Sequence, residues 1–448
     1  MGTNTPPRPS LSTIVQTGRF MKDPFALLQD CRDECGDVFL LRLLGLGEWV
    51  FLCSPQTAEE MFKAPEDCLS AGEANLKFLA FLLGTDSTIT KDGAEHRARR
   101  ALLSTFLNGK EAAGHTALSR QITEETIARW PLHEEFPLLP HTTKITLRLL
   151  LAVITGIRDR EKLDSLVGHA DEFFETALKS RLMVMPWLRW SLGKNSPWGR
   201  ILWLRRRLRD ALQEEIEARR QQQPGEPRDI LSALVMAEDS RGERLSNETI
   251  LDEIINLVSA GQETSSRILV WAVRGILSHP EALGEIRREL NEILGDRRIE
   301  EGDLPKFRYL DAVINEGIRY QPLGPFSGAR LAKKPFVIGG YEMPVGSLVA
   351  HCHAEISQRE DLFPRPRGFH PENFQDRSFE PYAWCPFGGG ARTCLGRGLA
   401  LTHLKAVLAT VFQHTELNLC QAEIKPVAGG GFLQVPDKGL LVELERRF

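Results

Sequence analysis

The feature that most constrains this 448-residue chain is a glycine-rich loop around one cysteine, between Phe387 and Gly396. The loop reads Phe-Gly-Gly-Gly-Ala-Arg-Thr-Cys-Leu-Gly. A thiolate lasts as a ligand only where its charge is stabilised, and glycine-exposed backbone N–H groups followed by a helix N-terminus do this. We therefore predict that Cys394 is a metal ligand and that Arg392 reaches an anionic group beside it. The alternative is a surface turn with a buried, inert cysteine.

The composition is that of a globular protein with a sizeable core. The chain is 42% hydrophobic and has a formal net charge of -4, which gives no general attraction for nucleic acid, so we expect no nucleic-acid partner. Its 8 cysteines show no paired zinc-binding spacing, which favours a reducing compartment.

The N-terminus does not resemble an export signal. It opens Met-Gly-Thr-Asn-Thr-Pro-Pro-Arg-Pro, without the basic start and apolar core of a signal peptide. No stretch approaches the roughly eighteen uninterrupted apolar residues of a membrane-spanning helix. These patterns predict a soluble, cytoplasmic protein.

Apolar residues recur at helical spacing through much of the chain, which predicts a helix-rich protein. The shorter predicted helices span about 117–130, 142–156, 161–181 and 199–220. The longest spans about 246–278, with Ser246 as its N-cap. In its centre, Ala260-Gly-Gln-Glu-Thr-Ser265, small residues permit close approach of a flat ligand, and Thr264 is expected to donate a hydrogen bond to the Ala260 carbonyl. An ordinary helix kink is the alternative.

The two motifs together resemble those of the cytochrome P-450 superfamily. The loop matches the superfamily pattern Phe-x-x-Gly-x-Arg-x-Cys-x-Gly at Phe387, Gly390, Arg392, Cys394 and Gly396. The resemblance implies a mainly α fold with small β-sheets, a triangular helical prism whose long central helix crosses a heme. It further implies an N-terminal extension of residues 1–22 before one catalytic domain over 23–448, with a small sheet region at about 328–352.

The resemblance also assigns roles around the cofactor, heme b. Cys394 is the expected axial ligand of the heme iron. Ala260 and Gly261 are expected to make room for dioxygen, while Glu263 and Thr264 are expected to supply protons to it.

Cationic side chains are expected around the two heme carboxylates, because arginine binds carboxylates with two parallel hydrogen bonds. The expected cofactor-binding residues are His96, Arg100, Arg330 and Arg392, together with Phe387, Gly388 and Gly396 of the loop. The alternative for any one of the cations is a solvated surface charge.

Glu316 and Arg319 are three residues apart and therefore share one face of a predicted helix. Alone, this would be a common surface ion pair. In the resemblance it is the Glu-x-x-Arg pair that fixes this helix against the segment before the cysteine loop. The third member is usually arginine, and this chain has Asn373, a neutral amide that can still bind Glu316. Arg367 or Arg377 is the expected substitute, unless the network is weaker here.

Substrate contacts are expected from segments on the distal side of the heme. The candidates are Phe78, Phe81, Asn256, Leu323, Phe326 and Phe432. For the first two, core packing explains the pattern equally well. This lining favours an apolar substrate of medium size.

Residues 182–204 concentrate tryptophan beside arginine. This combination suits a membrane–water boundary and predicts peripheral membrane contact, the alternative being a hydrophobic lid or a dimer contact.

The resemblance implies a monooxygenase that inserts one oxygen atom into an apolar C–H or C=C bond of a fatty acid, terpenoid or polyketide. Electrons from NAD(P)H are expected through a separate ferredoxin or flavodoxin and its reductase, since the chain has no flavin or iron–sulfur signature. The residues expected to face that partner are Arg99, Arg100, Arg397 and Lys405. Two alternatives stay open: oxidative coupling of aromatic rings in natural-product biosynthesis, and a noncatalytic heme-binding sensor.

Overall fold

The structure is a computed structural model that describes residues 4–180, 182, 189–222, 225–239, 241–428 and 433–448. Helices account for 57% of the chain, and the sheets are small, which confirms the predicted fold class. The first α-helices are α1 (Thr13–Lys22), α2 (Pro24–Cys35), α3 (Pro55–Lys63), α4 (Ala71–Leu83), α5 (Gly93–Leu107), α6 (Gly109–Ala113), α7 (Thr116–Ile127), α8 (Leu139–Thr155) and α9 (Arg160–Lys179). The later ones are α10 (Pro197–Arg220), α11 (Ile230–Met236), α12 (Asn247–Leu277), α13 (Pro280–Ile293), α14 (Arg308–Tyr320), α15 (His353–Ser357) and α16 (Arg397–His414).

Short 3-10 helices and strands connect these helices. The 3-10 helices are η1 (Thr88–Thr90), η4 (Glu301–Lys306), η5 (Pro371–Phe374), η6 (Gly390–Arg392) and η7 (Asp437–Gly439). The strands are β1 (Val38–Leu43), β2 (Gly47–Leu52), β3 (Leu69–Ser70), β4 (Glu135–Pro137), β5 (Ser327–Ala332), β6 (Val337–Ile338), β7 (Tyr341–Glu342), β8 (Leu348–His351), β9 (Thr415–Leu419), β10 (Pro426–Ala428), β11 (Gln434–Pro436) and β12 (Leu441–Arg447).

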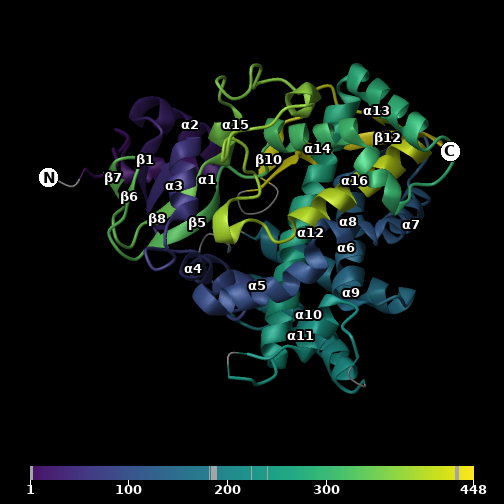
Figure 1. Ribbon diagram of the computed structural model, residues 1–448, viewed down its shortest axis with the longest axis horizontal. Coiled ribbons are helices and arrows are strands. Elements are labelled where there is room, and N and C mark those ends of the chain that lie inside the picture. The colour runs from purple at the N-terminus through teal and green to yellow at the C-terminus, as the bar shows by residue number, and fades with distance from the viewer. Residues whose placement is uncertain (1–3, 181, 183–188, 223–224, 240, 429–432) are drawn as a thin grey trace.

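The largest sheet pairs strands from residues 38–70 with strands from residues 327–351. Its strand order is β1-β2-β8-β5-β3, with β2 and β8 parallel and the other pairs antiparallel. A smaller sheet has the order β4-β12-β9. The first sheet lies with α1, α2 and α3 at one end of the molecule, while the long helices fill the rest (Figure 1).

Residues 1–22, predicted as an extension, include a helix that packs on this sheet. Ser12 caps α1 by accepting the Val15 N–H, and Phe20 is 1% exposed against the ring of Phe51. The Leu40 N–H of β1 donates to the Pro7 carbonyl at 2.8 Å. The described part of this segment is therefore held by the same core as the sheet.

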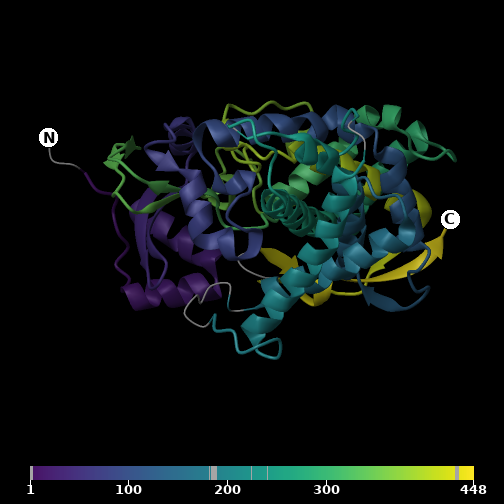
Figure 2. The ribbon, with the colours of Figure 1, turned by 90° about the horizontal axis from the view of Figure 1, so that it is seen from below.

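Helix α12 crosses the centre of the molecule, and Figure 2 views it nearly along its axis with other helices around it. Ser246 accepts the Thr249 N–H at the start, as predicted. Its first apolar stretch, from Ile250 to Val258, belongs to a core shared with α8, α9 and α10. Its second, from Ile268 to Ile276, belongs to a core shared with α13, α14 and α16. The segment with the predicted oxygen-binding residues lies between the two cores.

The other predicted helices correspond to α7, α8, α9 and α10, with ends shifted by up to three residues. His351 lies in β8, whereas His353 begins α15. Among the described helices, none combines the length and apolarity needed to cross a membrane.

Candidate active site

The cysteine loop is held by short backbone hydrogen bonds and by close packing on α3. The Cys394 N–H donates to the Phe387 carbonyl at 2.8 Å, and the Gly388 N–H donates to the Cys385 carbonyl at 3.0 Å. Gly390 has a φ of +63°, and a Cβ there would lie 2.4 Å from the Phe62 carbonyl oxygen. Only glycine fits this position without moving α3.

The sulfur of Cys394 faces a cavity of about 600 Å³ between α5 and the start of α16. The cavity is also lined by His96, Arg97, Arg100 and Arg397. Burial by the surrounding protein raises the pKa of Cys394, while the N–H groups of Gly396 and Arg397 and the charge of Arg100 act in the opposite direction. The sulfur is thus the centre of a small set of donors that favour its charged form.

Of the four predicted propionate-binding residues, His96 and Arg100 line this cavity, and Arg392 lies near His96 and Arg330. His96 is buried, and burial, then Arg392 and Arg100, lowers the pKa of its imidazole to about 4. Arg330 donates to the Met61 carbonyl at 2.9 Å. Burial, then the nearby Arg392, lowers the pKa of Arg330 to about 10. Arg392 contributes to both shifts because its positive charge lies near His96 and Arg330.

Two carboxylates not foreseen from the sequence balance these cations. Glu66 lies 3.9 Å from His96 and 3.8 Å from Arg392, and Arg392 also bonds to Asp92. No sequence motif marks Glu66 or Asp92 as part of the site. Their approach to Arg392 depends on how α3 and α5 pack.

The residues present fit a heme. Nδ1 of His96 and Nε of Arg392 are buried without a hydrogen-bond partner, and Arg100 makes no hydrogen bond to a described residue. Propionate oxygens would satisfy such donors. A Cβ at Gly396 would meet no atom within 4 Å, which leaves room for a flat group beside the sulfur. The cavity volume also lies in the range of cofactor sites.

On α12, Thr264 donates a hydrogen bond to the Ala260 carbonyl at 2.8 Å, which confirms the predicted back-bond. Ala260 is exposed, although it lies on a helix whose neighbouring turns are buried. Gly261 differs from the expectation. A Cβ there would lie 2.8 Å from Cδ1 of Leu150, so the missing side chain admits helix α8, and the room that we assigned to dioxygen is not on this side of the residue.

Glu263 is paired with an arginine that the sequence reasoning missed. Arg267, one turn later, bonds to the Glu263 carboxylate and donates to its backbone carbonyl at 2.8 Å. The two side chains are 13% and 5% exposed. A glutamate four residues before an arginine on a helix is the sequence signal for such a pair. Burial lowers the pKa of Arg267 to about 10, and the ion pair with Glu263 offsets part of the cost of removing both charges from water.

The Glu316–Arg319 pair is fully buried and acts as the hub of a network. Arg319 donates to Glu316 at 2.6 and 2.7 Å. It also donates to the carbonyls of Ser357, Pro366 and Gly368, at 3.1, 2.8 and 2.6 Å. This arginine therefore ties α14 to the chain that leads to the cysteine loop.

Asn373 keeps its place in the network as a neutral donor. Its amide lies 3.3 and 3.4 Å from the two Glu316 oxygens, and the His370 N–H donates to Glu316 at 2.6 Å. Neither expected substitute takes part: Arg377 is exposed and donates to the Leu362 carbonyl, and Arg367 is exposed. A backbone N–H compensates where we expected a second arginine.

Two of the predicted substrate contacts belong to an aromatic cluster beside the large sheet. The ring centroids of Phe78 and Phe326 lie 5.6 and 5.3 Å from that of Trp49. Phe326 also packs against Phe51 and Phe20. The apolar pattern here reflects core packing, because strand and helix side chains meet on the sheet face.

The other predicted substrate contacts differ in their surroundings. Phe81 packs against Trp198 of α10, with the Arg189 guanidinium 3.7 Å from its ring centre. Asn256 is buried and donates to Glu253 at 3.3 Å. Leu323 is half-buried and its carbonyl accepts the Gln434 N–H at 2.6 Å. Phe432 lies outside the described residues.

The basic residues predicted to face a redox partner divide into two groups. Arg99 is buried and pairs with Asp86 and Glu95, and Lys405 pairs with Asp311 at 3.0 Å with most of its side chain covered. Neither presents a free charge, which corrects the prediction. Arg100 and Arg397 line the Cys394 cavity together with Arg97.

The tryptophan-rich segment is described in part, since residues 183–188 lie outside the described ranges. Trp190 and Leu192 are 74% and 82% exposed. Trp203 lies under the guanidinium groups of Arg200 and Arg207. The described part thus presents apolar and basic groups to solvent.

Comparisons with known proteins agree with this geometry. The family model described as cytochrome P-450 matches residues 3–442. The putative cytochrome P-450 135B1 of Mycobacterium tuberculosis is 29% identical over 98% of this chain and 91% of its own length. The putative cytochrome P-450 137 of the same species is 31% identical over 91% of this chain and 83% of its own length. The solved structure of retinoic-acid-bound cyanobacterial CYP120A1 superposes with a TM-score of 0.85 at 23% identity, over 100% of both chains.

Proposed function

The chain belongs to the cytochrome P-450 family and is a monooxygenase, and we propose that it inserts one oxygen atom from O2 into an apolar fatty acid, terpenoid or polyketide. The site assignment rests on one observation: Cys394 lines a cavity of about 600 Å³, and backbone N–H groups and Arg100 lie near its sulfur. His96, Arg100, Arg330 and Arg392 would hold the propionates of a bound heme. When bound to this thiolate, heme iron supplies the activation of dioxygen.

Thr264 and Glu263 are the residues that we assign to proton delivery. The Thr264 hydroxyl is fixed by its bond to Ala260, so its oxygen stays at one place on the exposed side of α12. Glu263 is held by Arg267 on the next turn. We assign Arg267 as the residue that positions this carboxylate, because a buried arginine restricts its rotation.

A separate electron donor, a ferredoxin or flavodoxin, is the proposed partner. Two exposed cations at the cavity that Cys394 lines are not assigned to the propionates: Arg397, and Arg97, which is 64% exposed beside Glu66. Positive charge there would attract an acidic protein surface. Electrons would come ultimately from NAD(P)H through a reductase.

Peripheral membrane contact through the exposed part of residues 189–203 is a further proposal. It is supported by the exposure of Trp190 and Leu192, and by the basic side chains of Arg200 and Arg207 over the ring of Trp203. Co-sedimentation of the intact protein with liposomes tests it, and a protein that stays entirely in the supernatant would contradict it.

The cofactor assignment is tested by the reduced, carbon-monoxide-bound difference spectrum. We expect the strongly red-shifted Soret band of thiolate-ligated heme, and its loss in Cys394→Ser. Thr264→Ala is the matched variant on α12: it should keep the red-shifted band while diverting reducing equivalents to peroxide. A red-shifted band that persists in Cys394→Ser would refute the ligand assignment.

Product mass then distinguishes the reaction types. Oxygen insertion adds one oxygen atom to the substrate, whereas oxidative coupling removes two hydrogens. Thiolate-ligated heme without turnover of any apolar substrate would support the sensor alternative.

A further inference from the structure

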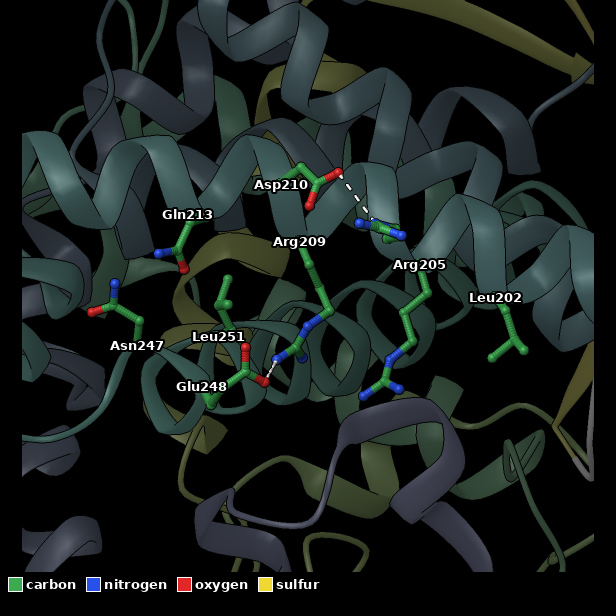
Figure 3. Close-up of a pocket in the computed structure, with 9 residues that line it drawn as sticks. Leu202, Arg205, Arg209, Asp210, Gln213, Asn247, Glu248 and Leu251 are labelled. Atoms are coloured by element: carbon green, nitrogen blue, oxygen red, sulfur yellow. Dashed lines mark hydrogen bonds and ion pairs between the residues drawn. The ribbon is translucent and has the colours of Figure 1, made fainter.

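A second cavity, of about 420 Å³, lies between α10 and the first turns of α12. It shares no lining residue with the cavity of Cys394. Its walls include Leu202, Arg205, Arg206, Arg209 and Leu251. Figure 3 shows Arg205 and Arg209 extending in the same direction from α10, with Glu248 of α12 at the tip of Arg209.

The charges of Arg209 and Arg206 are already balanced by carboxylates or solvated by water. Arg209 donates to Asp252 at 2.7 Å and also bonds to Glu248. Arg206 is 83% exposed, so water solvates it, and it lies 4.0 Å from Asp210. Neither arginine requires a further partner.

Arg205 is different because most of its side chain is covered and its Nε donor has no acceptor. Only 22% of the side chain is exposed, and its Nε is buried without a hydrogen-bond partner. Its nearest acid is Asp252, at 3.9 Å. The Asp252 carboxylate already accepts hydrogen bonds from Arg209 and from the N–H groups of Thr85 and Asp86, at 2.7, 2.9 and 3.1 Å.

A buried guanidinium N–H without a hydrogen bond is costly, since the donor has lost water and gained no acceptor. Nε of Arg392 is in the same condition near Cys394, where an anionic propionate is the expected partner. For Arg205, Asp252 at 3.9 Å balances the charge but lies beyond hydrogen-bond distance. An oxyanion would accept a hydrogen bond from the Arg205 Nε, because the guanidinium fork matches two of its oxygens.

We propose that Arg205, with Arg209 beside it, binds a phosphate group in this cavity. Asp210 and Glu248 also line the cavity, so the charge of the ligand must be low and a polyanion is disfavoured. Leu202 and Leu251 line the cavity with apolar surface, which can contact an apolar group attached to the phosphate. Both free phosphate and the phosphodiester of a lipid headgroup meet these requirements.

The test uses the full-length, heme-containing protein in a phosphate-free buffer. Isothermal titration with sodium phosphate, against sodium chloride of equal ionic strength, is expected to show one phosphate per chain. Arg205→Ala should weaken this affinity at least tenfold, as the loss of a charge-assisted fork implies. Arg206→Ala removes the same charge from the next residue and should weaken it less than threefold.

Co-sedimentation with phosphatidylglycerol vesicles, using the same two variants, distinguishes the source. If Arg205→Ala weakens phosphate binding in the titration, the ligand is free phosphate. If Arg205→Ala weakens binding only to vesicles, the ligand is a lipid headgroup. Equal weakening in the two variants, or no Arg205-dependent binding in either assay, overturns the proposal. Thermal unfolding verifies that each variant is folded, and neither binding assay depends on the oxygenase proposal.

Discussion

Among the charged residues near the site, Arg267 and Glu263 form a buried pair on one helix. The guanidinium and the carboxylate are both largely removed from water, at 5% and 13% exposure. Removal of either one would leave the other charge covered without this partner. The pair directs Glu263 along the helix to the next turn, while the hydroxyl of Thr264 is engaged with Ala260.

We expect Arg267→Gln to lower the free energy of unfolding by about 3 kcal/mol, because it leaves the Glu263 carboxylate covered and unpaired. The double variant Glu263→Gln, Arg267→Gln should lose less than the sum of the two single changes, since no charge is left unpaired. Urea unfolding measures all three.

Arg288→Gln on α13 is the matched control for this cycle. Arg288 also pairs with two glutamates on its own helix, Glu285 and Glu292, but all three side chains are about half exposed. Its replacement should therefore cost much less stability than the replacement of Arg267. Equal costs for the two arginine variants would contradict the dependence of Glu263 on Arg267.

At the scale of elements, the cysteine loop depends on how α14 is joined to the chain before it. Arg319 makes this junction with donors to Glu316 and to three backbone carbonyls. Asn373 contributes only the longer contacts of 3.3 and 3.4 Å, and the His370 N–H supplies the short one. The junction thus rests on one side chain and on backbone groups.

We expect Asn373→Ala to cost about 1 kcal/mol, the usual value of one hydrogen bond. Arg319→Ala should cost more than about 3 kcal/mol, or give no folded protein, because the Glu316 carboxylate and several carbonyls lose their partner together. Urea unfolding and retention of heme provide the comparison. An Asn373→Ala variant as unstable as Arg319→Ala would show that the amide carries the network.

At the scale of the whole molecule, two cores meet along α12, and its central turns contribute no side chain to either core. The core residues of the first half end at Val258 and those of the second half begin at Ile268. Between them Ala260 is exposed, and the polar pair of Glu263 and Thr264 follows. Separate cores on either side allow a polar segment in the interior without an interruption of the helix.

The stability of this body should depend on pH through its buried histidines. Burial, then the neighbouring His115, lowers the pKa of His403 to about 3. Its folded pKa thus lies below the unfolded value of about 6.5. As pH falls below the unfolded value, only the unfolded chain binds the proton, and stability is lost by up to about 1.4 kcal/mol per pH unit.

We therefore expect His403→Gln to reduce the slope of unfolding free energy against pH by about 1 kcal/mol per unit between about pH 6 and pH 5. Urea unfolding at a series of pH values gives the slope. The exposed His133, replaced in the same way, should leave it unchanged. An unaltered slope in His403→Gln would mean that this imidazole is protonated in the folded state.

The sequence by itself determined the features that depend on neighbours within one or two turns. The helix bounds, the N-cap at Ser246 and the bond from Thr264 to Ala260 follow from local spacing, because their hydrogen bonds close over three or four residues. The family, too, followed from the short motif around Cys394.

Only the tertiary structure decided which way a side chain faces and which distant charge it meets. Gly261 makes room for Leu150 of another helix, and Phe326 packs against Phe20, about three hundred residues earlier in the chain. Glu66 reaches Arg392 only because α3 packs near the cysteine loop. The physical reason is that burial and charge pairing depend on separation in space, which residue spacing does not specify beyond a single element.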